Sequence, residues 1–456
     1  MKQSLVISSC LLATAFASCQ PRLPPFPNLS AYPKAPAGFQ LPDGPNRDKV
    51  CVVRPGPDDA GPAILAAAKD CNNGGTVYLP AGNYTVATAL DLTFLDHIDF
   101  AIFGTIFFTA ESGHWVGKTF NYPYQSASLF WRFGGSNVNI YGGGKGTVDG
   151  LGQAYWDAMV TDKNILRPIL FGTDGLEQSS ITGLRMHNSP GWFNIITNSS
   201  NVLISDLVLD VEQKNKSAPA KNTDGWDTYR SSNIVIQNSK IVNTDGELES
   251  SVHEPLRVEE PQVLIFADCV SFKPNSTSIV IQGLDCTGSH GISVGSLGQY
   301  RDEVDIVEDI YVYNITMSQS TDGARIKVWP GIPNESDPAA SGGGSGRVRN
   351  VTYELFHNNN NDHAIAITQC YYQKNQTLCD LFPASLEIQD ISFLDFTGTT
   401  STKYAPRVGE LICSSPDVCS GIVARNINVK APGDKATFYR CHNFDESNVD
   451  INCVWP

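Results

Sequence analysis

The sequence predicts an all-β protein, and more specifically a parallel β-helix. A short unit recurs along the chain: a small residue or Asn, then alternating Ile and Val, then Asn, Asp or Gly. Each unit has the alternation of a strand and ends in turn residues, and one such unit cannot bury its own apolar face. The clearest copies occupy residues 201–206, 233–238, 278–283 and 309–314, and weaker copies start at Asn137, Arg349 and Leu386.

The spacing of the units favours stacked coils over the main alternative, a β-sandwich. Successive units lie about 20 to 40 residues apart, which suits coils that carry loops of variable length. A sandwich explains less naturally why a single register recurs. In addition, Ala60, Ile64, Leu65 and Ala68 predict one helix over residues 59–71 that caps an apolar end of the stack.

Length and charge agree with an elongated repeat fold. The chain has 456 residues, which is long for one ordinary globular core, and only 17% of them are charged. The formal net charge of −15 argues against nucleic acid or an anionic membrane as a partner. A polyanionic substrate would have to be held by a few local cations, and we expect a monomer.

Three segments are expected along the chain. Residues 1–17 have the pattern of a signal peptide, because Lys2 precedes a short apolar run and residues 15–17 form a small-x-small cleavage site. The apolar run is too short to span a bilayer, and a buried strand is the alternative. Residues 18–47 form a Pro-rich lead-in that packs on the outside, and residues 48–456 form the β-helix. A secreted, extracellular protein is therefore predicted.

Cysteine usage fits export. Apart from Cys10 and Cys19, which lie in or near the signal, ten cysteines form pairs that are close in sequence. Such a set is typical of disulfides in an oxidising compartment, and the absence of a CxxC motif argues against a zinc site. Proximity suggests the pairs Cys51/Cys71, Cys269/Cys286, Cys370/Cys379, Cys413/Cys419 and Cys441/Cys453.

Glycosylation sequons point the same way. Nine Asn-x-Ser/Thr triplets occur, although such triplets are also common by chance. The candidate asparagines are Asn28, Asn83, Asn198, Asn215, Asn275, Asn314, Asn334, Asn350 and Asn375.

Four short motifs are the candidates for chemistry, and each alone is weak. An isolated Asp at a turn is usually a cap, and Arg-x-Lys on a strand is usually solvated. The spacing is what makes the set informative: Asp224 and Asp245 are 21 residues apart, and Asp268 and His290 are 22 apart, which are one-coil steps. The motifs are Asn222-Thr223-Asp224, the split pair Asp245 and Asp268, Gly288-Ser289-His290-Gly291 and Arg325-Ile326-Lys327.

Stacked on successive coils, these side chains would share one wall of the helix. Arg325 and Lys327 point the same way, because residues i and i+2 share a strand face. Hydrolysis of a glycosidic bond needs a carboxylic acid for the leaving oxygen and a carboxylate that activates water. Arg and Lys beside such carboxylates suit an anionic sugar, whose own carboxylate they can hold.

With these motifs the chain resembles the polygalacturonases, pectin-cleaving glycoside hydrolases built on a right-handed, single-stranded, pectin-lyase-like parallel β-helix. The resemblance covers nearly the whole mature chain and includes residues 146–152 and 188–192. The segments that look most like the fungal exo-acting enzymes are residues 271–275, 293–300 and 328–331.

The resemblance implies a role for each acidic candidate. Asp245 would be the general acid that protonates the leaving oxygen. Asp224 and Asp268 would hold and deprotonate the attacking water, with inversion at the anomeric centre, and crowding should raise the pKa of one of the carboxylates. His290 would tune the acid through hydrogen bonding or charge. No metal or cofactor is implied, because side chains supply the acid, the base and the cations.

The resemblance also implies the substrate contacts. Arg325, Lys327 and Asn222 would bind galacturonate. Lys273 is either a residue that recognises a terminal galacturonate, giving exo action, or a surface lysine. In the family, the cysteines that correspond to Cys269 and Cys286 form a disulfide beside the site.

The leading hypothesis is a secreted exopolygalacturonase that removes galacturonic acid from the non-reducing end of homogalacturonan. An endo-acting or xylogalacturonan-cleaving relative is the alternative within the same class, and a rhamnogalacturonan hydrolase is less favoured. A third hypothesis, from a different class, is a pectin-binding protein without activity.

Residues 246–267 interrupt the acidic motif and are the reason for that third hypothesis. They contain five Glu and two Pro, and removing these 22 residues shortens the step from Ile234 to Ile279 from 45 residues to 23, a single coil. Gly-Glu at the start can be encoded with a GT donor and Ala-Asp at the end with an AG acceptor, so we interpret the segment as a retained intron. The alternative is a real extra coil or loop, which would place Asp245 and Asp268 on different turns.

Overall fold

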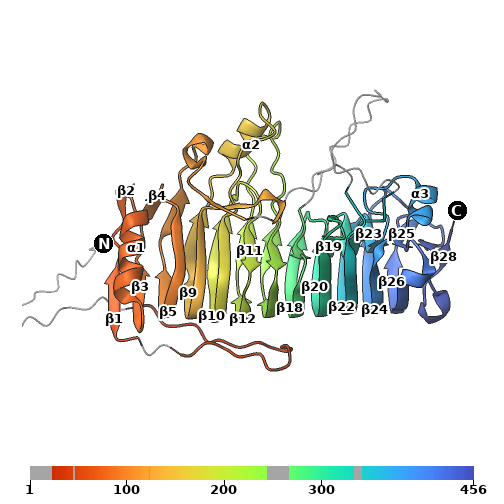
Figure 1. Cartoon of the computed structure of the whole chain (residues 1–456), viewed down its shortest axis with the longest axis horizontal. Helices are drawn as coiled ribbons and strands as arrows, with labels where there is room; N and C mark the ends of the chain where they lie inside the picture. Colours follow the sequence, from red (N-terminus) through yellow and green to blue (C-terminus); the bar gives the residue numbers. More distant parts are fainter. Residues whose placement is uncertain (1–22, 45–46, 123, 244–266, 333–340, 456) are drawn as a thin grey trace, which may run out of the picture.

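The chain forms one long stack of parallel strands, which confirms the predicted right-handed parallel β-helix (Figure 1). The computed structural model describes residues 23–44, 47–122, 124–243, 267–332 and 341–455. Within this part of the chain no helix is long and apolar enough to cross a membrane. The expected signal peptide, Cys10, Cys19, Asn334 and Asp245 lie outside the described residues.

Successive coils contribute to three parallel ladders. The first ladder contains β11 (Asn194–Thr197), β14 (Trp226–Tyr229), β17 (Val270–Phe272), β19 (Ile292–Leu297), β21 (Asp322–Val328), β23 (His363–Thr368), β25 (Arg407–Ile412), β27 (Phe438–His442) and β28 (Cys453–Val454). The second contains β1 (Lys49–Val52), β3 (Gly75–Leu79), β5 (Leu90–Ile102), β9 (Trp131–Asp149), β10 (Phe171–His187), β12 (Ser200–Ser205), β15 (Ser231–Gln237), β18 (Ser276–Thr287), β20 (Val304–Ser318), β22 (Ser345–Asn361), β24 (Ser385–Thr400) and β26 (Cys419–Lys430). The third contains β2 (Gly56–Asp59), β4 (Asn83–Val86), β6 (Thr105–Phe108), β13 (Val208–Asp210), β16 (Lys240–Val242) and the ends of the long strands.

Left-handed residues at the corners explain why Asn recurs in the repeat. Asn201 and Asn233 have φ of 54° and 52° where the chain enters the second ladder. Asn238 (φ 50°) and Gly283 (φ 63°) mark the next corner. Asn and Gly tolerate this conformation better than other residues. The repeated Asn and Gly are therefore explained by the geometry of the corners.

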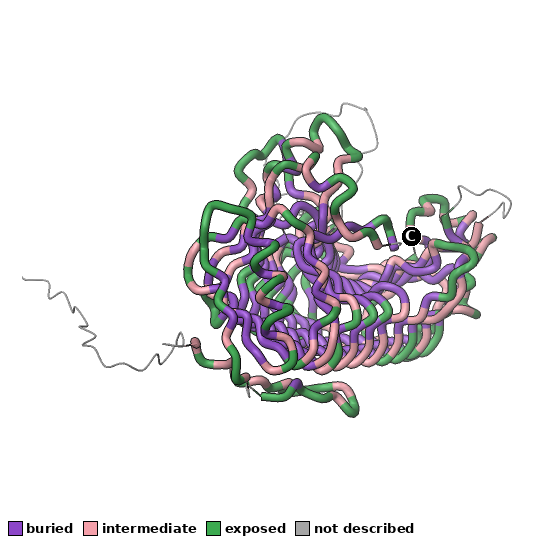
Figure 2. Tube along the Cα trace, turned by 60° about the vertical axis from the view of Figure 1, so that its left-hand side comes forward, coloured by how far each residue is buried: buried purple, intermediate pink, exposed green. Residues whose placement is uncertain are grey.

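The core consists of apolar side chains stacked in register from coil to coil. Val202, Ile234, Ile279 and Ile310 face one another on four successive strands, and all are buried. Figure 2 shows this buried interior running through the stack. Burying each such side chain contributes about 1.5–3 kcal/mol, so the repeated apolar positions fix the register.

A helix covers the N-terminal end, as the sequence predicts (Figure 1). It is α1 (Gly61–Cys71), which buries Ile64 and Ala68 and begins two residues later than expected. Asp59 stays outside the helix, where its carboxylate accepts hydrogen bonds from the backbone of Gly61 and Ala87 at 2.9 Å each. Two shorter helices, α2 (Gln153–Met159) and α3 (Gln376–Leu381), lie in loops.

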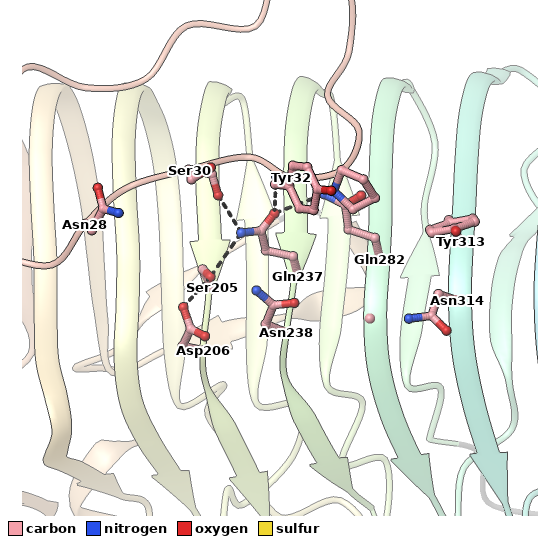
Figure 3. Close-up of a pocket in the computed structure, with 12 residues that line it drawn as sticks. Asn28, Ser30, Tyr32, Ser205, Asp206, Gln237, Asn238, Gln282, Tyr313 and Asn314 are labelled. Atoms are coloured by element: carbon pink, nitrogen blue, oxygen red, sulfur yellow. Dashed lines mark hydrogen bonds between the residues drawn. The ribbon is translucent and has the colours of Figure 1, made fainter.

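The lead-in runs along the outside of the second ladder over its described residues, 23–44. Backbone groups of Ser30, Tyr32 and Lys34 hydrogen-bond Gln237 and Gln282 on two successive coils. Figure 3 shows the contacts of Ser30 and Tyr32 with Gln237, beside a cavity of about 320 Å³. The cavity is lined by residues of the second ladder and the lead-in, so it is separate from the candidate site on the first ladder.

Five disulfides are present, and they join the same five pairs that sequence proximity suggests. Of the eight sequon asparagines that the structure describes, Asn275 is half-buried. The other seven are exposed: Asn28, Asn83, Asn198, Asn215, Asn314, Asn350 and Asn375.

Candidate active site

The first ladder brings most of the predicted site residues together. Asp224, Asp268, His290 and Asp322 occupy equivalent places on four successive coils, because each lies two residues before one of the in-register residues at the start of β14, β17, β19 and β21. All four side chains are buried. The backbone NH of Gly225 donates to the Asp268 carbonyl at 2.9 Å, which joins the first two of these coils.

A row of aligned residues on the side of the first ladder away from the core, with Lys327 beside it, completes the site. The strand pairing aligns Asp227, Ser271, Ser293 and Arg325 across four coils. Lys327 lies two residues after Arg325 and shares its face, as predicted. The described site therefore combines carboxylates, an imidazole and cations on one wall of the helix.

Asp268 lies one coil beyond Asp224, because β14 pairs with β17 and the Gly225 NH reaches the Asp268 carbonyl. Asp245 lies outside the described residues, so its predicted one-coil step from Asp224 stays a prediction.

The alternative of an extra coil between Asn243 and Asp268 is contradicted, whereas the alternative of an inserted loop falls on residues outside the described ones and stays open. β14 pairs directly with β17, and β15 pairs directly with β18, so the coil before the segment is stacked on the coil after it. At the corner itself the Asn243 side-chain amide donates to the carbonyls of Thr223 (2.7 Å) and Asp268 (3.1 Å). Asn243 and Asp268 thus flank one corner, and the residues between them are not needed for the stacking of the described strands.

Asp268 is held as a carboxylate. Its Oδ2 lies 2.7 Å from the Lys327 ammonium, and its Oδ1 accepts a hydrogen bond from the Ser293 hydroxyl at 2.6 Å. Burial alone would raise the pKa of Asp268, but Lys327, Lys273 and Arg325 outweigh burial and lower it below the usual value. An ionised carboxylate at this place can accept a proton from water.

Two further carboxylates are shifted in the opposite direction. Burial and the neighbouring Asp227 raise the pKa of Asp224 well above its usual value. Burial raises the pKa of Asp227 to about 6, although Lys273 favours its ionised form from 3.5 Å away. The sequence-based expectation that crowding would raise one carboxylate pKa agrees with this direction at Asp224.

His290 is a neutral group in this setting. Burial, and then the positive charge of Arg325, lower the pKa of its imidazole to about 3. The family resemblance implies that His290 tunes the general acid through hydrogen bonding or through charge. Above that pH the imidazole is uncharged, so it can act on the acid through hydrogen bonding but not through a positive charge.

Arg325 is fixed by groups on its own and the next coil. Its guanidinium lies 3.0 Å from the Asp322 carboxylate, whose other oxygen lies 3.2 Å from Nδ1 of His363. Burial would raise the pKa of Asp322, but Arg325 and His363 lower it below the usual range. The Tyr371 ring lies 5.9 Å from the Arg325 guanidinium.

Lys273 and Asn222 are engaged within the protein. Lys273 is buried, with its ammonium near Asp227 and 5.5 Å from the Trp192 ring, so the surface-lysine interpretation is wrong. Asn222 accepts a hydrogen bond through its side-chain oxygen from Arg167 at 2.8 Å. Substrate contact by either residue stays a prediction.

The first ladder is covered on the N-terminal side of the site. One coil before Lys273, the outward position is Tyr229, and the Tyr124 ring stacks on it with centroids 4.5 Å apart. The segment that carries Tyr124 is tied down by Tyr122, whose hydroxyl accepts from Thr197 (2.8 Å) and donates to Asp174 (2.9 Å). Toward the C-terminus, Tyr372, Tyr404 and Trp455 are more exposed than Tyr124 and Tyr229.

Sequence reasoning missed Asp227, Ser293, Asp322 and His363. Asp322 lies on β21, the strand of the candidates Arg325 and Lys327, and Asp227 and Ser293 each follow a candidate, Asp224 and His290, by three residues. Ser293 also stands in register with Arg325. His363 had no motif of its own, since only the tertiary pairing with Asp322 distinguishes it.

Comparison with known proteins agrees with this geometry. The model of the glycosyl hydrolases family 28 matches residues 75–250 and 242–453 in two pieces, which overlap at the start of the interrupting segment. Exopolygalacturonase A of Aspergillus niger is 55% identical over 458 positions that cover 100% of both chains. The exopolygalacturonase of Cochliobolus carbonum is 47% identical over 471 positions, covering 100% of this chain and 98% of that one.

Solved structures show the same architecture. The endo-xylogalacturonan hydrolase from Aspergillus tubingensis has a TM-score of 0.74 at 34% identity, covering 89% of this chain and 98% of that one. The polygalacturonase from Erwinia carotovora ssp. carotovora has a TM-score of 0.61 at 19% identity, covering 91% and 99%, and supports the fold alone. The predicted resemblance is confirmed: the chain is a glycoside hydrolase that belongs to the glycosyl hydrolases family 28.

Proposed function

We propose that the protein is an exopolygalacturonase that releases galacturonic acid from the non-reducing end of homogalacturonan. The observation that carries this proposal is the full-length similarity to fungal exopolygalacturonases, at 55% identity for the one from Aspergillus niger. The carboxylates and cations of the first ladder supply groups for the reaction, and the covered N-terminal side fits exo action.

The reaction follows from the protonation states of the carboxylates. Asp268 is ionised, and its contact with Lys327 orients it, so it accepts a proton from the attacking water. Asp224 assists where it is ionised, but its raised pKa makes that fraction smaller at acidic pH. Asp245 protonates the leaving oxygen. Water attacks the face opposite the leaving group, and the anomeric centre inverts.

The substrate carboxylate is bound by Arg325 and Lys327. Arg325 offers a planar pair of donors that Asp322 and Tyr371 hold in place. Lys327 also pairs with the Asp268 carboxylate. Binding of the substrate carboxylate to Lys327 therefore changes the charge around Asp268, the base, when the substrate binds. His290, uncharged, contributes a hydrogen bond near the acid.

Exo action follows from the covered side of the ladder. A chain that lies along the first ladder can extend past Lys327 toward the C-terminal coils. In the other direction Tyr229 and Tyr124 occupy the next outward position, with Trp192 beside Lys273. Only one sugar then fits on that side of the cleaved bond, and each event releases a monomer.

The proposal is tested by incubating the protein with polygalacturonate and separating the products over time. Monomeric galacturonic acid should be the product from the first time points, while viscosity falls slowly. Oligomers with a rapid fall in viscosity would indicate endo action, and pectin binding without new reducing ends would indicate the inactive binder.

A second candidate is an endo-xylogalacturonan hydrolase, favoured by the structural similarity to the Aspergillus tubingensis enzyme at 34% identity. It is distinguished by the substrate: a xylose-decorated galacturonan should be cut internally. We also propose secretion, which the five disulfides and seven exposed sequon asparagines support.

A further inference from the structure

Aromatic rings beside cations continue along the first ladder beyond the proposed reaction centre. Three such pairs follow one another toward the C-terminus, and the last two are not part of the site described above. Their cation-to-centroid distances are 5.9 Å for Arg325 and Tyr371, 4.5 Å for Arg407 and Tyr404, and 5.7 Å for Arg440 and Trp455.

The strand register places the last pair in line with the first. Arg325, Ala366, Glu410 and Arg440 are neighbours on four successive strands, β21, β23, β25 and β27. Three steps of about 4.8 Å separate Arg440 from Arg325 by about 14 Å. Each 1,4-linked pyranose unit of a polysaccharide advances by a length similar to one of these steps. The same polysaccharide chain that Arg325 holds therefore reaches Arg440 about three sugars later.

The Trp455 ring has a built support although it lies at the end of the chain. It stacks on His442 with centroids 4.1 Å apart and an interplanar angle of 20°. His442 in turn lies 3.1 Å from the Asp380 carboxylate. β28 pairs with β27, and the Cys441–Cys453 disulfide links the two strands, so the ring is held beside the outward row.

The exposure of Trp455 and the charge of Arg440 suit the binding of a sugar acid. Trp455 is 46% exposed, and the Arg440 side chain is 35% exposed with Glu410 as its partner at 3.3 Å. An exposed aromatic face packs against the C–H face of a pyranose ring, and an arginine beside it can bind the ring's carboxylate.

We propose that Arg440 and Trp455 form a distal subsite for a galacturonate unit about three sugars beyond the one bound by Arg325 and Lys327. The proposal rests on the proposed function, because it assumes that a galacturonan chain follows the first ladder. It predicts that affinity rises with chain length until the substrate reaches this pair.

The test is calorimetric binding of tri- and hexagalacturonate to the full chain carrying Asp268→Asn, which prevents cleavage during the titration. Hexagalacturonate should bind about tenfold more tightly than trigalacturonate. Adding Trp455→Ala or Arg440→Gln should weaken hexagalacturonate binding about three- to tenfold, in keeping with one aromatic or charge-assisted contact. Neither change should alter the affinity for trigalacturonate, which is too short to reach the pair.

Tyr32→Ala is the matched control, because Tyr32 is a 74% exposed aromatic residue on the lead-in. It should leave both affinities unchanged. Equal affinity for the two oligomers, an unchanged hexagalacturonate affinity in the variants, or an equal loss for both oligomers would each overturn the subsite. Hydrolysis of digalacturonate by the chain with Asp268 intact tests the proposed function separately, since this substrate does not reach Arg440.

Discussion

The two sides of the acidic cluster differ in how the first ladder meets its surroundings. On the N-terminal side, Tyr124 stacks on Tyr229, and both are nearly buried. On the C-terminal side, Tyr372, Tyr404 and Trp455 are between 39% and 62% exposed. Both sides use aromatic residues, so their number does not distinguish them. What differs is whether a second layer covers the rings, and in our proposal this difference directs a polymer to the C-terminal side of the reaction centre.

The largest effect should come from the group that activates water. Asp268→Asn removes the proton acceptor while keeping a side chain of the same size, so kcat on trigalacturonate should fall about 10³-fold. Steady-state rates measure this loss. Asp285→Asn, an exposed aspartate on β18, is the matched control and should retain full activity. If Asp268→Asn kept more than a tenth of the activity, Asp268 would not be the group that activates water.

The second effect concerns the corner next to Asp268. Deleting residues 246–267 should raise kcat/KM about 10²-fold over the full-length chain, because the acid and the water-binding carboxylate then become neighbours in the sequence. The two proteins are compared on trigalacturonate. Equal activity would show that the interrupted corner already places Asp245 correctly, and transcripts that all retain the segment would argue against the intron hypothesis.

The third effect links charge to pH. Lys327 helps to hold the pKa of Asp268 below its usual value. Lys327→Met should therefore let burial raise that pKa, so that the base becomes protonated at a higher pH than in the parent. The acidic limb of the kcat/KM profile should move to higher pH, and kcat/KM at the optimum should fall about tenfold through the lost carboxylate contact.

Lys240→Met is the control for this profile, since Lys240 is an exposed lysine on β16, in the coil that precedes Asp268. Its acidic limb should coincide with that of the parent. An acidic limb in Lys327→Met that stays in place, or moves to lower pH, would mean that another group sets it.

The smallest effect addresses the covered side directly. Replacing Tyr124 and Tyr229 together by Ala should open the outward position before Lys273. A minor share of digalacturonate, about a tenth of the product or less, should then appear beside the monomer, because local packing near the opening relaxes only in part. Chromatography of early products detects it. If a folded double variant released monomer alone, residues other than Tyr124 and Tyr229 would be the ones that close the N-terminal side.

The sequence predicted the coils because their signal is local. Asn201 and Asn233 bend the chain at corners, and Val202 and Ile234 follow them into the core, so each repeat carries both its turn and its register. The alternation of side chains along a strand likewise predicted that Arg325 and Lys327 share a face. These features depend on neighbours within one coil and can be read from short patterns.

Contacts between distant segments were not predictable in the same way. The Asp227–Lys273 pair spans the interrupted corner, and the Tyr124–Tyr229 stack joins a loop to a strand of a later coil. Asp268 stacks beside Asp224 because strand pairing brings the start of β17 next to the start of β14. The long sequence interval between these two aspartates does not reveal this contact.

The most direct test of the account is the cleavage of hexagalacturonate that carries a label at its reducing end. The account predicts a labelled pentamer first, then a tetramer and a trimer in order, with unlabelled monomer released at each step. A labelled dimer or trimer among the first products would contradict closure on the N-terminal side. A labelled monomer would contradict the direction of attack.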